Sequence, residues 1–99
     1  MAHITTGSVW NAIEKDPAEA RAMERKSLVL SKVQERLEAK RWTQSEAAKH
    51  LGVDQPRVSD LVQGKITKFS LDTLMSFLDR LDQPVAISFP PKARKLEDV

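Results

Sequence analysis

The sequence predicts an all-α domain, a bundle of about five helices with one short β-strand near the C-terminus. Most of the chain consists of segments whose apolar residues recur every three or four positions, which is the spacing of an amphipathic helix. Capping residues, prolines and glycines separate these segments where helices should begin and end. Only residues 85–89, "VAISF", show the alternation and β-branched content of a strand. A chain of 99 residues has room for one domain with one modest core.

The first long helix is expected to begin at Pro17. Asp16 is a suitable N-cap, and proline is favoured at the first helical position because its missing N–H is not needed there. The segment that follows, as far as Arg41, has no glycine or further proline. It places four apolar residues on one face: Met23, Leu30, Val33 and Leu37. Residues 1–16 form an N-terminal segment, in which "SVWNAIEKD" (8–16) could form a short helix.

Two shorter helices are expected within "TQSEAAKHLGVDQPRVSDLVQGK" (43–65). Thr43 caps the first, and Glu46 three residues later completes a capping box. Gly52 supplies the left-handed residue that ends this helix. Asp54 caps the second helix, and another glycine ends it. Because helices of about eight residues are marginal alone, the two must pack on each other and on a third element.

The apolar residues of the two short helices indicate how they pack. The expected inner face contains Ala47, Ala48 and Leu51 from the first helix, and Val58, Leu61 and Val62 from the second. This arrangement is a helix-turn-helix. A last helix should follow the cap Ser70, with a buried stripe of Leu71, Leu74, Phe77, Leu78 and Leu81. Residues 17–83 are therefore predicted to form a helix-turn-helix DNA-binding domain.

The outward side of the second short helix is centred on Pro56 and Asp60, at about 100° per residue. In DNA-binding helix-turn-helix proteins this helix enters the major groove. Arg57 is the first candidate for a base contact and Gln55 the second, because these side chains match guanine and adenine edges. Ser59 could reach a base or a phosphate, and Asp60 could accept from a cytosine amino group or orient Arg57. Phosphate contacts are expected from Gln44, Lys49, Gln63, Lys65 and Lys68. The alternative is a helix-turn-helix with a purely structural role.

Residues 84–91 are expected to form an arm around the predicted strand. A lone strand leaves its backbone groups unpaired, and the sequence shows no second strand. The expected partner is the same strand of a second subunit, in an antiparallel ribbon with Val85, Ile87 and Phe89 at the dimer interface. The alternative is an extended arm that packs on its own domain. Residues 92–99 form a charged tail.

The stretch 43–65 resembles the helix-turn-helix of the Cro and phage-repressor-like (Xre) family. The small residue, the turn glycine and two later apolar positions of that family correspond to Ala48, Gly52, Val58 and Leu61. With "FSLDTLMSFLDRL" after it and "GSVWNAIEKDPAEA" before it, the sequence is similar more narrowly to HigA-type antitoxins. The resemblance extends over residues 7–89.

The resemblance implies a lambda-repressor-like fold, a homodimer, and an antitoxin that represses its own operon. It also implies a ribonuclease toxin of the RelE or HigB type as partner, which could dock on Val9, Trp10 and Ile13. Two residues depart from the family pattern. Asp54 stands where Thr or Ser is common, close to where a phosphate is expected, and Asp60 is an acid on the side that should face DNA.

Composition excludes several other classes of protein. The formal net charge of +2 is too small to argue nucleic-acid binding unless the charges are placed on one surface. The chain has no cysteine, no signal-like N-terminus and no apolar run of about 20 residues, so we expect a cytoplasmic protein without a membrane role. Two isolated histidines and the lack of a nucleophile or phosphate-loop motif predict no metal, no cofactor and no enzyme activity.

The expected function is therefore a dimeric repressor that binds double-stranded operator DNA. Two alternatives remain open from the sequence. One is a stand-alone phage-type regulator without a toxin. The other is a protein-interaction module that inhibits a partner enzyme and has lost DNA binding.

Overall fold

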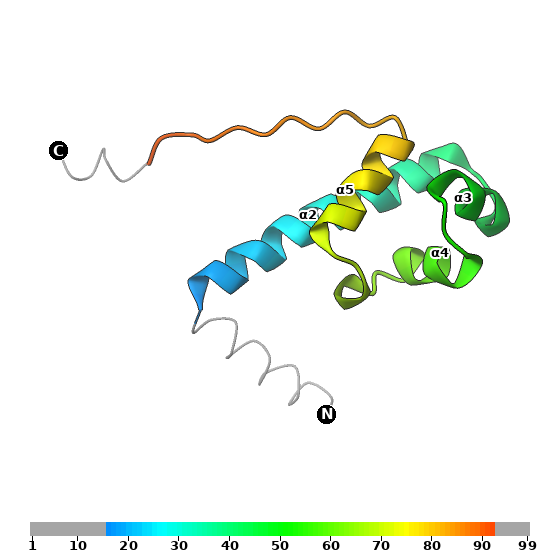
Figure 1. The fold of residues 1–99 in the computed structure, drawn as a ribbon, viewed down its shortest axis with the longest axis horizontal. Coiled ribbons are helices and arrows are strands. Elements are labelled where there is room, and N and C mark those ends of the chain that lie inside the picture. The colour runs from blue at the N-terminus through cyan, green and yellow to red at the C-terminus, as the bar shows by residue number, and fades with distance from the viewer. Residues whose placement is uncertain (1–15, 93–99) are drawn as a thin grey trace, which may run out of the picture.

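The computed structural model of the chain describes residues 16–92. Within this range it contains four α-helices and one 3-10 turn: α2 (Pro17–Lys40), α3 (Gln44–Leu51), α4 (Gln55–Val62), η1 (Ile66–Lys68) and α5 (Leu71–Arg80). Figure 1 shows α5 alongside α2, with α3 and α4 grouped near the C-terminal end of α2. The prediction of an all-helical domain is confirmed. The described residues hold four helices instead of about five, and the helix predicted near the N-terminus lies outside them.

The first two helices begin where the sequence predicts, because their caps use neighbouring residues. The Asp16 side chain accepts a hydrogen bond from the N–H of Ala18 at 3.1 Å, and Pro17 occupies the first helical position. At α3, the Thr43 hydroxyl accepts from the N–H of Glu46 at 3.1 Å, and the Glu46 carboxylate accepts from the N–H of Thr43 at 2.8 Å. The predicted capping box is therefore formed.

The connections between helices are short and use left-handed residues. Helix α2 ends at Arg41, whose φ is 57°, three residues before α3 begins. Helix α3 ends at Gly52, whose φ of 73° favours glycine. The Asp54 side chain then caps α4 by accepting from the N–H of Arg57 at 3.1 Å. These tight joints fix the directions of α3 and α4 relative to each other.

The core lies between α2 and α5 and extends under the helix-turn-helix. Its buried residues are Leu30, Val33, Leu37, Ala47, Ala48, Leu51, Val58, Leu61, Phe69, Leu74, Phe77, Leu78 and Leu81. Phe69, in the connection before α5, was not expected in the core. Its ring meets Phe77 edge to face, with centroids 6.1 Å apart, and so joins this connection to α5.

Two residues that were predicted to be buried are exposed. Val62 is 55% exposed and Leu71 is 37% exposed. Val62 lies in the last turn of α4 and Leu71 in the first turn of α5, at the flank of each helix's buried face. The sequence pattern marked them as apolar, but neither helix is covered on that flank.

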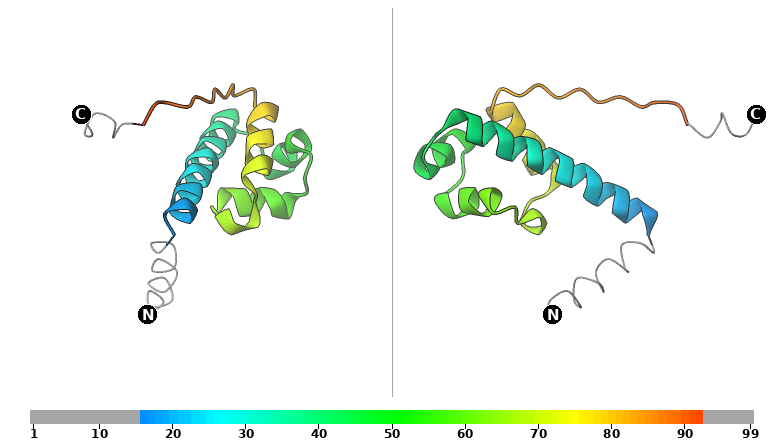
Figure 2. Two further views of the ribbon diagram at one scale, coloured as in Figure 1. Left: turned by 60° about the vertical axis from the view of Figure 1, so that its left-hand side comes forward. Right: turned by 180° about the vertical axis from the view of Figure 1, so that it is seen from behind.

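The predicted C-terminal strand is wrong for the single chain. The structure assigns no strand within residues 16–92, and residues 84–92 form an exposed extended segment that leaves the end of α5 (Figures 1 and 2). Val85, Ile87 and Phe89 are 42%, 70% and 92% exposed, so the arm does not pack on its own domain either. The physical reason is that a strand needs a partner for its backbone N–H and C=O groups, and this part of the chain offers none.

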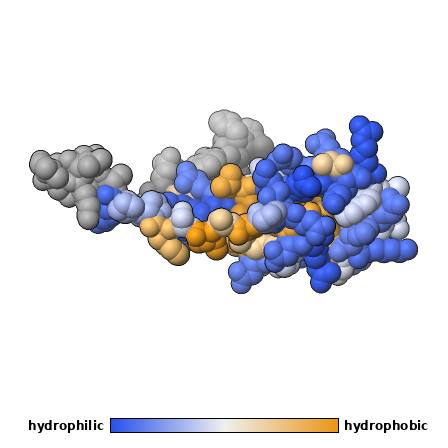
Figure 3. Space-filling model, turned by 90° about the horizontal axis from the view of Figure 1, so that it is seen from above, coloured by the Kyte–Doolittle hydropathy of each residue, from blue (hydrophilic) through white to orange (hydrophobic). Residues whose placement is uncertain are grey.

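The arm also carries much of the apolar surface of the molecule. Figure 3 shows hydrophobic residues gathered along the arm and the middle of the molecule, and hydrophilic residues over the end that holds α3. The two ends therefore differ in character. The polar end contains the helix-turn-helix.

Candidate nucleic-acid interface

Helix α4 is attached to the domain along one face. Its own Val58 and Leu61 side chains are buried in the core. The Gln34 side chain on α2 donates a hydrogen bond to the backbone carbonyl of Leu61 at 2.9 Å. The N–H of Val53, in the turn before α4, donates to the carbonyl of Ala48 at 3.0 Å. Apolar contacts and backbone hydrogen bonds therefore hold α4 at the surface beside α3 (Figure 1).

The free face of α4 is polar and largely uncharged. Gln55, Pro56 and Gln63 are exposed, and Ser59 is half-exposed. The Gln63 amide donates to the Ser59 hydroxyl at 3.0 Å, which orients both side chains. Of the predicted base-reading residues, Gln55 and Ser59 lie on this outward face; Gln63 was predicted as a phosphate contact and Pro56 as the centre of the face.

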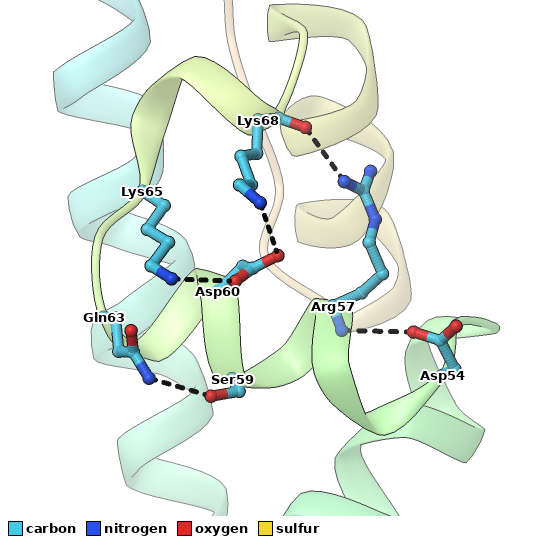
Figure 4. A network of polar contacts seen from close by, with 7 residues as sticks. All are labelled: Asp54, Arg57, Ser59, Asp60, Gln63, Lys65 and Lys68. Atoms are coloured by element: carbon cyan, nitrogen blue, oxygen red, sulfur yellow. Dashed lines mark hydrogen bonds and ion pairs between the residues drawn. The ribbon is translucent and has the colours of Figure 1, made fainter.

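Arg57 and Asp60 have other partners (Figure 4). The Arg57 guanidinium donates to the Lys68 carbonyl at 2.9 Å and lies 4.3 Å above the Phe69 ring. The Asp60 carboxylate, 18% exposed, lies 3.6 Å from the Lys65 ammonium and 4.0 Å from that of Lys68. Asp60 therefore pairs with two lysines after the helix. It does not orient Arg57, which was one of the roles considered from the sequence.

The predicted phosphate-contacting side chains are all exposed: Gln44, Lys49, Gln63, Lys65 and Lys68. Gln44 is the first residue of α3, so it stands beside the free N–H groups of that helix. Lys65 and Lys68 lie just beyond the C-terminal end of α4. Gln44 lines a groove with Val58 and Val62 of α4, and the ammonium groups of Lys65 and Lys68 lie near Asp60 of the same helix. Lys49 lies on the side of α3 opposite its buried residues.

Arg41 is a cation at this surface that the sequence analysis missed. It borders a groove of about 510 Å³ between α2, α3 and α4, together with Gln44 and Val62. Its backbone N–H donates to the Glu38 carbonyl at 3.2 Å, so its position is fixed as the cap of α2. A basic residue three positions before Gln44, at the end of a long helix, was the signal that could have revealed it.

Trp42 and His50 form a second local cluster. The Trp42 ring stacks on His50 with centroids 3.9 Å apart, and the Lys40 ammonium lies 5.5 Å from the Trp42 ring. Trp42 also packs against the core, as its position before the α3 cap predicts. His50 is exposed to solvent and at the same time stacks on Trp42.

Within residues 16–92, no group of three or more His, Asp or Glu side chains is placed to hold a metal ion. None of the described helices is long and apolar enough to cross a bilayer. The surface around α4 consists of the polar outer face of that helix and four exposed side chains near it: Arg41, Gln44, Lys65 and Lys68.

Comparison with known proteins identifies the fold that carries this surface. Residues 13–89 match a family of helix-turn-helix domains. A solved structure of an XRE-family transcriptional regulator superposes with a TM-score of 0.72 at 34% sequence identity, over 77% of this chain and 85% of that chain. The chain belongs to the XRE family of helix-turn-helix transcriptional regulators. No protein with a curated description matches it.

Membership of the XRE family confirms the resemblance over the helix-turn-helix and implies regulation through DNA binding. The narrower likeness to HigA-type antitoxins stays a prediction. The positions named for a toxin contact, Val9, Trp10 and Ile13, lie outside the described residues.

Proposed function

We propose that this XRE-family protein is a transcriptional repressor that binds a short palindromic operator with α4 in the major groove. The observation that carries the proposal is the two-sided character of α4. One side of α4 carries the buried residues Val58 and Leu61. The other side carries Gln55, Ser59 and Gln63, and α3 of the same helix-turn-helix lies beside it. A helix of this width with a polar outer face fits the major groove of B-DNA.

The side chains around α4 are suited to contact DNA phosphates on both sides of the major groove. Gln44 and the α3 N-terminus would meet one phosphate strand, and Lys65 and Lys68 the other. Arg41, beside Gln44, would add a further phosphate contact. Gln55, at the exposed start of α4, would reach an adenine edge.

The local charge supports binding as a dimer. Residues 43–68 carry four basic side chains and three acidic ones, so the net charge of this region is 4 − 3 = +1. The basic side chains are Lys49, Arg57, Lys65 and Lys68, and the acidic ones are Glu46, Asp54 and Asp60. Few phosphates can be neutralised by one copy, so one copy should bind DNA weakly. Two copies on a palindrome would double the contacts.

The arm is the proposed means of dimerisation. Val85, Ile87 and Phe89 alternate along an extended segment and are exposed, so one face of the segment is apolar. Pairing two such segments across a two-fold axis would bury these side chains and satisfy the backbone groups that are unpaired in one chain. Prolines at 84, 90 and 91 would limit the ribbon to residues 85–89.

The finer form of the proposal is an antitoxin of a HigBA-type pair. It is supported by the sequence resemblance over residues 7–89, and its partner would be a RelE- or HigB-type ribonuclease toxin. A stand-alone regulator would share the same DNA surface. Co-purification with a small basic protein encoded beside it would distinguish the antitoxin from the stand-alone regulator.

The test of DNA binding is fluorescence anisotropy with the duplex just upstream of the gene, across a salt series. An unrelated duplex of equal length is the control. The expected result is selective binding of the upstream duplex, with a binding curve that rises more steeply than for a single site. The logarithm of the binding constant should fall linearly with the logarithm of the salt concentration. Equal weak binding to both duplexes would contradict the proposal and favour an interaction module.

A further inference from the structure

The two charged residues of α4 both reach back to the connection between α4 and α5 (Figure 4). Arg57 donates to the Lys68 carbonyl at 2.9 Å, and Asp60 lies 4.0 Å from the ammonium of the same lysine. The N–H of Lys65 also donates to the Asp60 carbonyl at 3.0 Å. Positions 57 and 60 are three apart and share one side of the helix. Arg57 and Asp60 therefore both bind the connection between α4 and α5.

Arg57 makes a second contact with this connection, through Phe69. The central carbon of its guanidinium lies 4.3 Å from the centre of the Phe69 ring, a cation–π distance. Phe69 is buried, and it meets Phe77 of α5 edge to face. The Arg57 side chain therefore links α4 to the core through Phe69. To reach a base, it would have to give up both the hydrogen bond and the ring contact.

The side chains left on the outward face of α4 carry no charge. They are Gln55, Pro56, Ser59 and Gln63. A glutamine amide pairs in bidentate fashion with adenine N6 and N7, whereas guanine is read best by arginine or lysine. Arg57 is the sole basic residue within Gln55–Val62, and it is turned away.

We propose that Arg57 is a positioning residue that holds α4 against the connection 65–69, and that the operator half-site is read by uncharged side chains. This inference rests on the proposed DNA-binding function. It predicts that each operator half-site contains an A·T pair that Gln55 contacts in the major groove. It also predicts that Arg57 specifies no guanine there.

The test is enrichment of bound duplexes from a randomised pool, carried out with the wild type and with three variants. Gln55→Ala should relax the preference at one adenine by about tenfold or more. Arg57→Ala should lower affinity for every enriched duplex by a similar factor and leave the base preferences unchanged. Arg57→Lys keeps a cation near Phe69 and should recover part of that loss. A guanine preference that disappears in both Arg57 variants would overturn the proposal.

A second measurement needs no variant and so does not depend on how the variants fold. A proton of the Arg57 side chain that lies over the Phe69 ring should show an upfield shift in the NMR spectrum of the free protein. The shift should persist in the complex with an enriched duplex. Its loss in the complex would show that Arg57 leaves Phe69 for DNA. A pool from which no sequence is enriched would contradict the proposed function itself, which separates that failure from a failure of the Arg57 assignment.

Discussion

Replacing Gly52 with alanine should destabilise the domain by about 1 kcal/mol. Gly52 ends α3 with a φ of 73°, and its N–H donates to the carbonyls of Ala48 and Lys49. A side chain in this left-handed conformation costs about 1–2 kcal/mol. Alanine also restricts the unfolded chain, which offsets about 0.4–1 kcal/mol of that cost. The new Cβ would lie 3.3 Å from the Arg80 guanidinium, the end of a flexible side chain that can shift, so it adds little.

Circular dichroism during thermal and urea unfolding measures this effect. A loss of about 1 kcal/mol lowers the midpoint of a domain of this size by about 4–8 °C. Gly52→Asn is the matched control, because asparagine tolerates the left-handed region and should lose less stability than alanine. An alanine variant with an unchanged midpoint would refute the reasoning, since it would mean that the joint between α3 and α4 does not require a left-handed residue.

Three further predictions concern the core, the DNA surface and pH. Leu61→Ala, at a fully buried position under α4, should cost about 2–5 kcal/mol in urea unfolding; a smaller loss would contradict the packing of α4. Arg41→Gln should weaken binding to all duplexes and reduce the salt slope by about 1, whereas Arg25→Gln on the far half of α2 should do neither. The hydrogen bond and charge of Lys32 hold the pKa of Glu35 below its usual value. At a pH above the ordinary pKa of a glutamate, the Lys32–Glu35 pair therefore stabilises the fold. This stabilisation is lost as the pH falls through the lowered pKa of Glu35. In an NMR titration, Lys32→Gln should bring the pKa of Glu35 back up; an unchanged value would exclude the pair as the cause.

The helix boundaries could be predicted from the sequence because caps are local. The Thr43–Glu46 capping box and the Gly52 turn each involve residues within four positions of each other, so their spacing alone specifies them. The buried face of α3, and that of α4 apart from Val62, followed from helical periodicity. Membership of the helix-turn-helix class was therefore visible before the structure.

The partners of Arg57 and Asp60 could not be predicted in this way. A helical wheel gives the direction of a side chain from its own helix axis, but it does not show what lies beside that helix. The path of residues 65–69 brings Lys68 and Phe69, eleven and twelve positions away from Arg57, next to its guanidinium. That path depends on the burial of Phe69 in the core, which the sequence pattern did not reveal.

The strand expected at residues 85–89 shows a different limit of sequence reasoning. Its alternating pattern indicates that one face will be covered, but it does not say whether the cover comes from the same chain. In the single chain the arm is exposed, and the proposed cover is the same segment of a second copy. Deleting residues 84–99 should leave a folded monomer in analytical ultracentrifugation, and a dimer of the deleted form would exclude the arm as the interface.

The claim that α4 meets DNA is tested most directly by NMR, with the protein's backbone amides followed as the upstream duplex is added. The account predicts shift changes at Gln44, at Gln55, from Arg57 to Gln63, and at Lys65 and Lys68, with the N-terminal half of α2 unaffected by DNA. Changes confined to α2 or to the arm, with α4 unmoved, would contradict it.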